Sequence, residues 1–234
     1  MPRNVTFVPG FMQRGESWQP VAARLAERYR VSCLDFATWT FEQRLDEMPT
    51  GGAVVGYSMG GRLALHAALR EPGRYASLVL VGVSAGVADR DERRRADEAL
   101  AGWMEQHSIE AVVERWERQP VFSTQSPELR AQQRAGRLTH DPRKLAQLLR
   151  SAGQGVLEPV WDRLPELRCP VLLMAGELDR PYAAAAKRMA ERIPGARVRI
   201  VPGAGHAPQL EQPRLVAEFL DEHLCDGGVV DREA

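Results

Sequence analysis

Lysine and cysteine are both scarce in this sequence, and each scarcity narrows what the protein can be. Of 31 basic residues only Lys144 and Lys187 are lysines, so the other 29 are arginines. The cysteines Cys33, Cys169 and Cys225 are an odd number without a close pairing pattern, which predicts reduced thiols and a cytoplasmic protein. Because 31 acidic residues balance the basic ones, charge gives no case for nucleic acid or a membrane surface as a partner.

Long apolar runs and cofactor motifs are also missing. No run approaches the length that spans a membrane, and the N-terminal MPRNVTFVPGF leads straight into a strand pattern, which leaves no room for a signal peptide. A dinucleotide fingerprint begins at Gly203 but fails where Pro208 replaces its third glycine. No metal-ligand spacing joins the remaining histidines, which are His66, His107, His140 and His223. We therefore expect neither a metal nor an organic cofactor.

Short apolar segments alternate with helical patterns at both ends of the chain. This alternation is typical of an α/β protein with a doubly wound, mostly parallel sheet of about six strands, covered by helices on both faces. The expected strands contain Val5–Val8, Val31–Leu34, Ala53–Val55, Leu78–Val81, Val171–Ala175 and Val198–Val201.

The strand pattern disappears between residue 84 and residue 159. This stretch is charged, has helical periodicity and is too long for a loop, so we interpret it as a helical cap inserted into the sheet domain. The core would then comprise residues 1–83 and 160–226, and residues 227–234 would form a frayed tail.

Ser58 stands between a buried strand pattern and a helix pattern, in the stretch VVGYSMGGRLAL. Glycines at positions 56, 60 and 61 surround it. This G-x-S-x-G pattern is typical of a nucleophile elbow, in which a sharp turn exposes the serine hydroxyl above the sheet. The alternative is an ordinary glycine-rich turn whose serine caps the helix.

A base and its partner follow two later strands. Asp179 comes after the strand at 171–175, and His206 comes after the strand at 198–201. Loops at the carboxyl ends of parallel strands share one crevice, so Ser58, Asp179 and His206 are predicted to meet as a catalytic triad. Backbone N–H groups of Phe11 and Met59 could form an oxyanion hole. Taken singly, Asp179 could instead cap a helix and His206 could be an ordinary loop histidine.

The chain order Ser, Asp, His and the elbow identify the whole chain as similar to the α/β-hydrolase superfamily. Within it, the chain resembles the 2-succinyl-6-hydroxy-2,4-cyclohexadiene-1-carboxylate synthases of menaquinone biosynthesis. The matching stretches are GYSMGGRLAL, ERRRADEAL, ERWERQPVFST, QRAGRLTHDP and PVWDRLPELRCPVLLMAGELD. The resemblance implies a Ser-His-Asp lyase that eliminates pyruvate from a ring bearing several carboxylates. It also implies a set of substrate-contacting residues, which are Tyr57, Arg62, Arg95, Trp116 and Arg137.

The chain departs from the family pattern at several places outside the triad. Pro9 replaces a histidine, Val81 a glutamate and Ala207 an asparagine, and Asp179 is followed by Arg180-Pro181-Tyr182 rather than by a Lys-Phe pair. The chain also begins at what is normally the third strand, so the N-terminal hairpin of the family is missing. These departures affect the choice of substrate rather than the catalytic groups.

Three functions remain open from the sequence. A triad serves elimination and hydrolysis equally, so the alternative to a pyruvate-eliminating synthase is a carboxylesterase or a related acyl or C–C bond hydrolase. A non-catalytic ligand-binding protein on the same fold is the third possibility. In each case the partner is a small carboxylate or ester, and the sequence does not give the oligomeric state.

Overall fold

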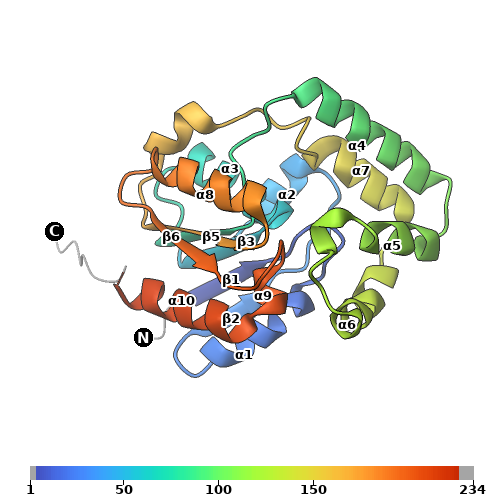
Figure 1. Cartoon of the computed structure of the whole chain (residues 1–234). Coiled ribbons are helices and arrows are strands. Elements are labelled where there is room, and N and C mark those ends of the chain that lie inside the picture. The colour runs from blue at the N-terminus through green and yellow to red at the C-terminus, as the bar shows by residue number, and fades with distance from the viewer. Residues whose placement is uncertain (1–3, 227–234) are drawn as a thin grey trace.

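The computed structural model describes residues 4–226, and its centre is a six-stranded parallel sheet (Figure 1). The strand order is β2-β1-β3-β4-β5-β6, which confirms the predicted α/β class. The chain reverses its direction of winding between β1 and β3, and ligands of such folds bind beside that switch point. The strands are β1 (Asn4–Val8), β2 (Arg30–Cys33), β3 (Ala53–Tyr57), β4 (Ser77–Val81), β5 (Val171–Gly176) and β6 (Arg197–Val201).

The three central strands are buried on both faces, because successive apolar side chains point to opposite sides of the sheet. Val54 packs in one core cluster and Val55 in the other. Continuous apolar runs of this kind are expected when helices cover both faces of a parallel sheet.

Helices cover the two faces in separate layers (Figure 1). One layer holds α1 (Gln19–Leu25) and α10 (Pro213–Asp226), and the other holds α2 (Phe41–Glu47), α3 (Met59–Arg70) and α8 (Arg180–Ala190). The shorter elements are the 3-10 turns η1 (Gly15–Trp18), η2 (Pro120–Phe122) and η3 (Trp161–Glu166), together with the short helix α9 (Pro208–Glu211).

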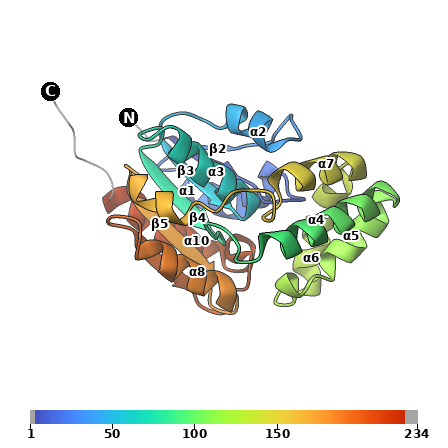
Figure 2. The ribbon, with the colours of Figure 1, turned by 90° about the horizontal axis from the view of Figure 1, so that it is seen from above.

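Four helices lie between β4 and β5 in sequence and stand to one side of the sheet (Figure 2). They are α4 (Arg90–Glu105), α5 (Ile109–Glu117), α6 (Pro127–Leu138) and α7 (Pro142–Ala152). Each begins where a side chain accepts a hydrogen bond from a backbone N–H of the first turn, namely at Asp89, Ser108, Ser126 and Asp141. All four fall within the stretch that we interpreted as a cap.

The two ends of this inserted stretch are joined to each other. The backbone N–H of Val160 donates to the carbonyl oxygen of Ala85 at 2.7 Å. Next to this bond, a side chain at Gly86 would lie 2.6 Å from Cβ of Pro159, so only glycine allows the two segments to approach so closely. The insertion therefore leaves and re-enters the core through one narrow stem.

Within residues 4–226, no helix is both long and apolar enough to cross a membrane. The expected frayed tail, residues 227–234, lies outside the described residues.

Candidate active site

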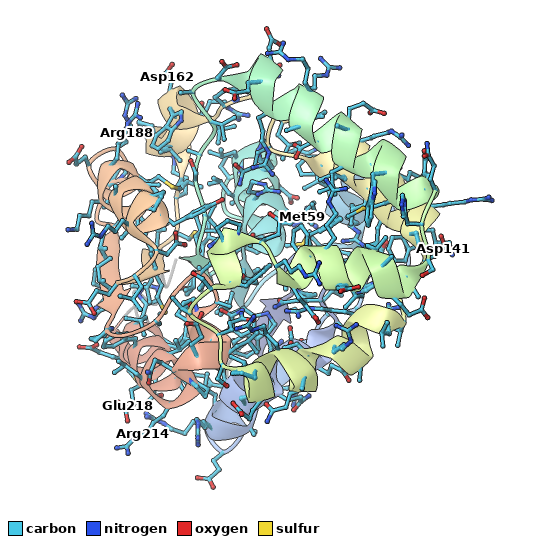
Figure 3. The ribbon with its side chains drawn as sticks, turned by 45° about the vertical axis from the view of Figure 1, so that its right-hand side comes forward. Met59, Asp141, Asp162, Arg188, Arg214 and Glu218 are labelled. Carbon is cyan, nitrogen blue, oxygen red and sulfur yellow. The ribbon has the colours of Figure 1, made fainter. Side chains whose placement is uncertain are left out.

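Ser58 occupies a strained turn between β3 and α3. Its backbone has φ 49° and ψ −112°, a conformation that residues other than glycine rarely adopt. The turn is possible because its neighbours are small: a Cβ on Gly56 would lie 2.5 Å from Cα of Gly61, and one on Gly60 would lie 2.4 Å from the Pro9 carbonyl oxygen. Figure 3 shows the next residue, Met59, near the middle of the molecule at the start of α3. This geometry matches the predicted elbow.

Asp179 and His206 meet Ser58 at the carboxyl ends of β3, β5 and β6. The Nδ1 atom of His206 lies 2.6 Å from Oδ2 of Asp179, and its Nε2 atom lies 3.3 Å from Oγ of Ser58. Asp179 stands at the N-cap position of α8, yet its carboxylate makes no capping hydrogen bond. The carboxylate accepts from the imidazole instead, which fixes the tautomer that leaves Nε2 free to take a proton from serine.

Two tyrosine rings pack beside the imidazole of His206. The Tyr182 ring centroid lies 4.6 Å away and that of Tyr57 lies 5.4 Å away. Burial raises the pKa of Tyr57 well above its usual value, so this phenol stays neutral. The imidazole itself is almost completely buried, and its orientation is therefore set by packing as well as by Asp179.

Phe11 and Met59 both line the cavity above Ser58. Met59 is the first residue of α3, and the first N–H groups of a helix have no partner within the helix. Phe11 belongs to a tight turn in which the backbone N–H of Gln13 donates to Gly10 at 3.2 Å and the Gln13 side-chain oxygen accepts from Gly10 N–H at 3.3 Å. Both residues predicted for the oxyanion hole thus line the same cavity as Ser58.

The cavity between the sheet domain and the four inserted helices has a volume of about 450 Å³. Its aromatic wall is built around Trp116, whose ring lies 5.2 Å from that of Phe11 and 5.6 Å from that of Phe122. Tyr57, Ser58 and His206 lie at the core side of the cavity, and the cap contributes residues from α4 to α7. A ligand here would therefore touch apolar rings, polar groups and the serine hydroxyl together.

Arg62 and Arg137 bring two buried guanidinium groups to this cavity. Arg137 donates to Oε1 of Glu117 at 3.0 Å, and Arg62 donates to the carbonyl oxygen of Ala152 at 3.1 Å. Burial lowers the pKa of both arginines from the usual value. The Nε atom of each is buried without a hydrogen-bond partner in the protein.

The structure places Arg95 away from the cavity. Arg95 is exposed and borders a separate surface depression, whereas Arg93 lines the cavity. Two residues on a helix point about 200° apart, so the side chains of Arg93 and Arg95 leave α4 on opposite faces. The inward face could have been found by following the buried residues Met104 and Ala101 backwards in steps of three and four, which leads through Asp97 to Arg93.

Arg93 also pairs within its own helix. Its Nε donates to Oδ1 of Asp97 at 2.8 Å, and the Asp97 side chain is only 4% exposed while that of Arg93 is 45% exposed. Of the other arginines that line the cavity, Arg137 shares the carboxylate of Glu117 with Arg134, and Arg62 is bonded to a backbone carbonyl oxygen. Arg115 lies over the ring of Trp103.

A second serine and histidine pair lies elsewhere in the structure. In this pair the histidine donates the hydrogen bond and the serine accepts it. Oγ of Ser77 is 2.9 Å from Nε2 of His223, and Nη2 of Arg197 is 3.1 Å from Nδ1 of His223. Because arginine can only donate, Nδ1 must accept and Nε2 must carry the hydrogen. His223 cannot then act as a base toward Ser77, and this pair is structural.

Among residues 4–226, no group of three or more histidine, cysteine, aspartate or glutamate side chains is placed to hold a metal ion.

Comparison with known proteins finds a matching family and several relatives that share one name. The model of the alpha/beta hydrolase family matches residues 7–219. A Bacillus subtilis protein, provisionally named a 2-succinyl-6-hydroxy-2,4-cyclohexadiene-1-carboxylate synthase, is 38% identical over 177 residues, which cover 73% of this chain and 65% of that protein. The synthase of the same name from Serratia proteamaculans is 30% identical over 179 residues, covering 75% and 68%. The chain thus spans about two thirds of the length of these two relatives.

Solved structures resemble the fold over nearly its full length. MenH from S. aureus superimposes with a TM-score of 0.86 at 28% identity, covering 96% of this chain and 94% of that one. A thermophilic esterase from Thermogutta terrifontis gives 0.83 at 23% identity, with 98% and 92% covered, and that likeness shows the fold alone. The chain therefore belongs to the alpha/beta hydrolase family, and within it the chain is similar to the 2-succinyl-6-hydroxy-2,4-cyclohexadiene-1-carboxylate synthases.

Proposed function

We propose that this chain is a lyase that eliminates pyruvate from a polycarboxylate ring and so forms 2-succinyl-6-hydroxy-2,4-cyclohexadiene-1-carboxylate in menaquinone biosynthesis. One observation carries the proposal: a Ser58–His206–Asp179 array opens into a cavity with arginines on several sides. The names of the relatives from Bacillus subtilis and Serratia proteamaculans and of the S. aureus structure support the same reaction.

The chemistry needs only proton transfer and charge stabilisation. Nε2 of His206 takes the hydroxyl proton of Ser58, and the serine oxygen removes a proton from a carbon of the substrate ring. The electrons of that C–H bond form a new C=C bond as the C–O bond to the enolpyruvyl group breaks. The leaving enolate takes the proton held by His206 and departs as pyruvate. No electron acceptor or metal is required by this balance, and we propose that the enzyme works without a cofactor.

Negative charge builds up on the substrate as the ring loses its proton. The backbone N–H groups of Phe11 and Met59 would stabilise that charge, because backbone donors are held in place before the reaction begins. In the same site, Asp179 stabilises the imidazolium that forms when His206 holds the proton.

Arg62, Arg93 and Arg137 are the proposed carboxylate-binding residues. They come from α3, α4 and α6, so they approach the cavity from different directions and could hold separate carboxylates. Guanidinium groups suit this task because they bind carboxylates through two parallel hydrogen bonds. Trp116 and Tyr57 would provide the apolar surface against which the ring rests.

The test offers the purified protein the enolpyruvyl precursor and, separately, a small neutral aryl ester. Release of pyruvate by the wild-type protein, absent in Ser58→Ala, is the expected result. Turnover of the ester alone would mean that the protein is a carboxylesterase and that the departures at Pro9, Val81 and Ala207 determine its substrate. If neither substrate reacts and a fluorophosphonate leaves Ser58 unlabelled, the protein is a binding protein without catalysis.

A further inference from the structure

Tyr182 contacts both the catalytic histidine and the segment that follows α7. Its ring packs on His206 with centroids 4.6 Å apart, and its hydroxyl oxygen accepts a hydrogen bond from Nε2 of Gln154 at 2.7 Å. Both Tyr182 and Gln154 line the cavity. Tyr182 belongs to α8 of the core, whereas Gln154 belongs to the chain segment that leaves α7. One side chain therefore connects the imidazole of the triad with the helices above it.

The first turn of α8 holds the imidazole from two sides. Asp179 and Tyr182 are three residues apart, so they lie on one face of the helix. The carboxylate fixes Nδ1 at 2.6 Å, but a single hydrogen bond still allows the ring to pivot about it. Packing of the tyrosine ring removes that freedom and keeps Nε2 directed at Ser58.

Gln154 is held in place by its neighbours in the segment of residues 152–155, which we call the strap. The backbone N–H of Gly155 donates to Oδ2 of Asp97 at 3.4 Å. A Cβ on Gly153 would lie 2.5 Å from the same oxygen, so the strap passes directly over this buried carboxylate. Arg62 donates to the carbonyl oxygen of Ala152 at 3.1 Å. The position of Gln154 therefore depends on α4 and α3 as well as on α7.

We propose that Tyr182 is a positioning residue that couples the seating of the strap over the cavity to the orientation of His206. When the strap is seated, the hydrogen bond from Gln154 holds the phenol ring against the imidazole. When the strap moves away, Tyr182 loses that bond and the imidazole loses a fixed neighbour. This proposal rests on the triad of the proposed function but not on the identity of the substrate.

The two contacts of Tyr182 can be removed one at a time. Tyr182→Phe and Gln154→Leu each delete the hydrogen bond and keep the ring. We expect each to raise KM of whichever substrate the wild-type protein turns over by about two- to tenfold, with a smaller change in kcat, as for loss of one hydrogen bond. The double variant should be no worse than either single variant, because all three lack the same bond.

Tyr182→Ala and Tyr182→Leu remove the ring as well. We expect the rate at which a fluorophosphonate labels Ser58 to fall by about two- to tenfold in both, as for loss of one aromatic contact. Tyr182→Phe keeps the ring but lacks the bond from Gln154, so it should label at a rate between those of these two variants and that of the wild type. Leucine fills more of the vacated space than alanine, so agreement between the two variants separates loss of the ring from loss of packing, and thermal unfolding checks that each variant is folded.

Tyr29→Phe is the matched control. It makes the same chemical change and deletes a 2.8 Å hydrogen bond to Asp221, between α10 and the residues after α1. It should leave KM and the labelling rate unaltered. Additive losses in the double variant, or wild-type labelling in Tyr182→Ala and Tyr182→Leu, would overturn the coupling. Failure of the wild-type protein itself to label would instead count against the proposed function.

Discussion

Replacing Arg93 by alanine tests whether the cavity binds a carboxylate through α4. Arg93 faces the cavity and Arg95, two residues later, does not, so the pair offers the same substitution on opposite faces of one helix. We expect Arg93→Ala to lower kcat/KM for the polycarboxylate and Arg95→Ala to leave it within about twofold of wild type.

The size of the loss follows from the surroundings of Arg93. A hydrogen bond to a charged partner contributes about 1.5–3 kcal/mol, which corresponds to roughly a 10- to 150-fold change in kcat/KM. The Arg93 side chain is 45% exposed and already shares its charge with Asp97, so water and the carboxylate both weaken its hold on a ligand. We therefore expect the lower end of the range, a loss of about tenfold.

Removing Arg93 also leaves the buried carboxylate of Asp97 without its cation, which should lower stability. The double variant Arg93→Ala/Asp97→Asn removes that charge while it keeps an oxygen acceptor for the backbone N–H of Gly155. It should regain thermal stability without regaining kcat/KM. Steady-state kinetics with the polycarboxylate and with a neutral aryl ester, together with thermal unfolding, measure all of these effects.

Two results would refute this reasoning. Equal losses for the polycarboxylate and the neutral ester in Arg93→Ala would mean that Arg93 supports the structure of the cap rather than binding a carboxylate. If Arg95→Ala lowered kcat/KM for the polycarboxylate as much as Arg93→Ala, the face of α4 from which an arginine projects would not determine whether it binds the substrate.

Further predictions concern the triad, acid stability and metal dependence. Ser58→Ala, His206→Ala and Asp179→Asn should each lower kcat by about two orders of magnitude or more in steady-state assays, and combining any two should cost little extra, because the three groups act as a unit. Burial lowers the pKa of both His66 and His140 to about 4. The unfolded chain therefore binds more protons between about pH 6.5 and pH 4, and the free energy of unfolding should fall as pH decreases through that window, by at most about 3 kcal/mol for each histidine. Urea unfolding at several pH values checks this, and phenylalanine at either position should flatten the slope; an unchanged slope would contradict the assignment. Incubation with a chelator should leave turnover unchanged, and loss of activity that a divalent ion restores would show that a metal is needed.

Much of the fold and of the site could be predicted from sequence because it depends on local pattern. The apolar runs that form the strands differ by one or two residues from the observed bounds, as at β3, where Ala53–Val55 extends to Tyr57. Ser58, Asp179 and His206 lie on loops at the carboxyl ends of three parallel strands, so the sheet topology predicts that they meet.

What could not be predicted depends on helix rotation and on contacts across the cap. A stretch rich in arginine, such as Arg93–Arg95, gives no local sign of which side chain faces inward. The resemblance to a family pointed to Arg95, whereas Arg93 lines the cavity. The hydrogen bond between Gln154 and Tyr182 joins residues 28 positions apart on separate elements, and no periodicity connects them. Tyr182 was visible only as a departure from the family pattern.

The stem formed by Ala85 and Val160 would allow the four inserted helices to be replaced as one segment. Because the hydrogen bond between these two residues already brings the ends of the insertion together, a replacement segment would not have to supply that closure itself. The strained serine turn, the acid and the base all lie on the other side of the stem, on loops that follow β3, β5 and β6. Selectivity could thus be rebuilt by grafting a different set of helices onto residues 85 and 160, provided that the graft again supplies a hydrogen-bond partner for Tyr182 in place of Gln154.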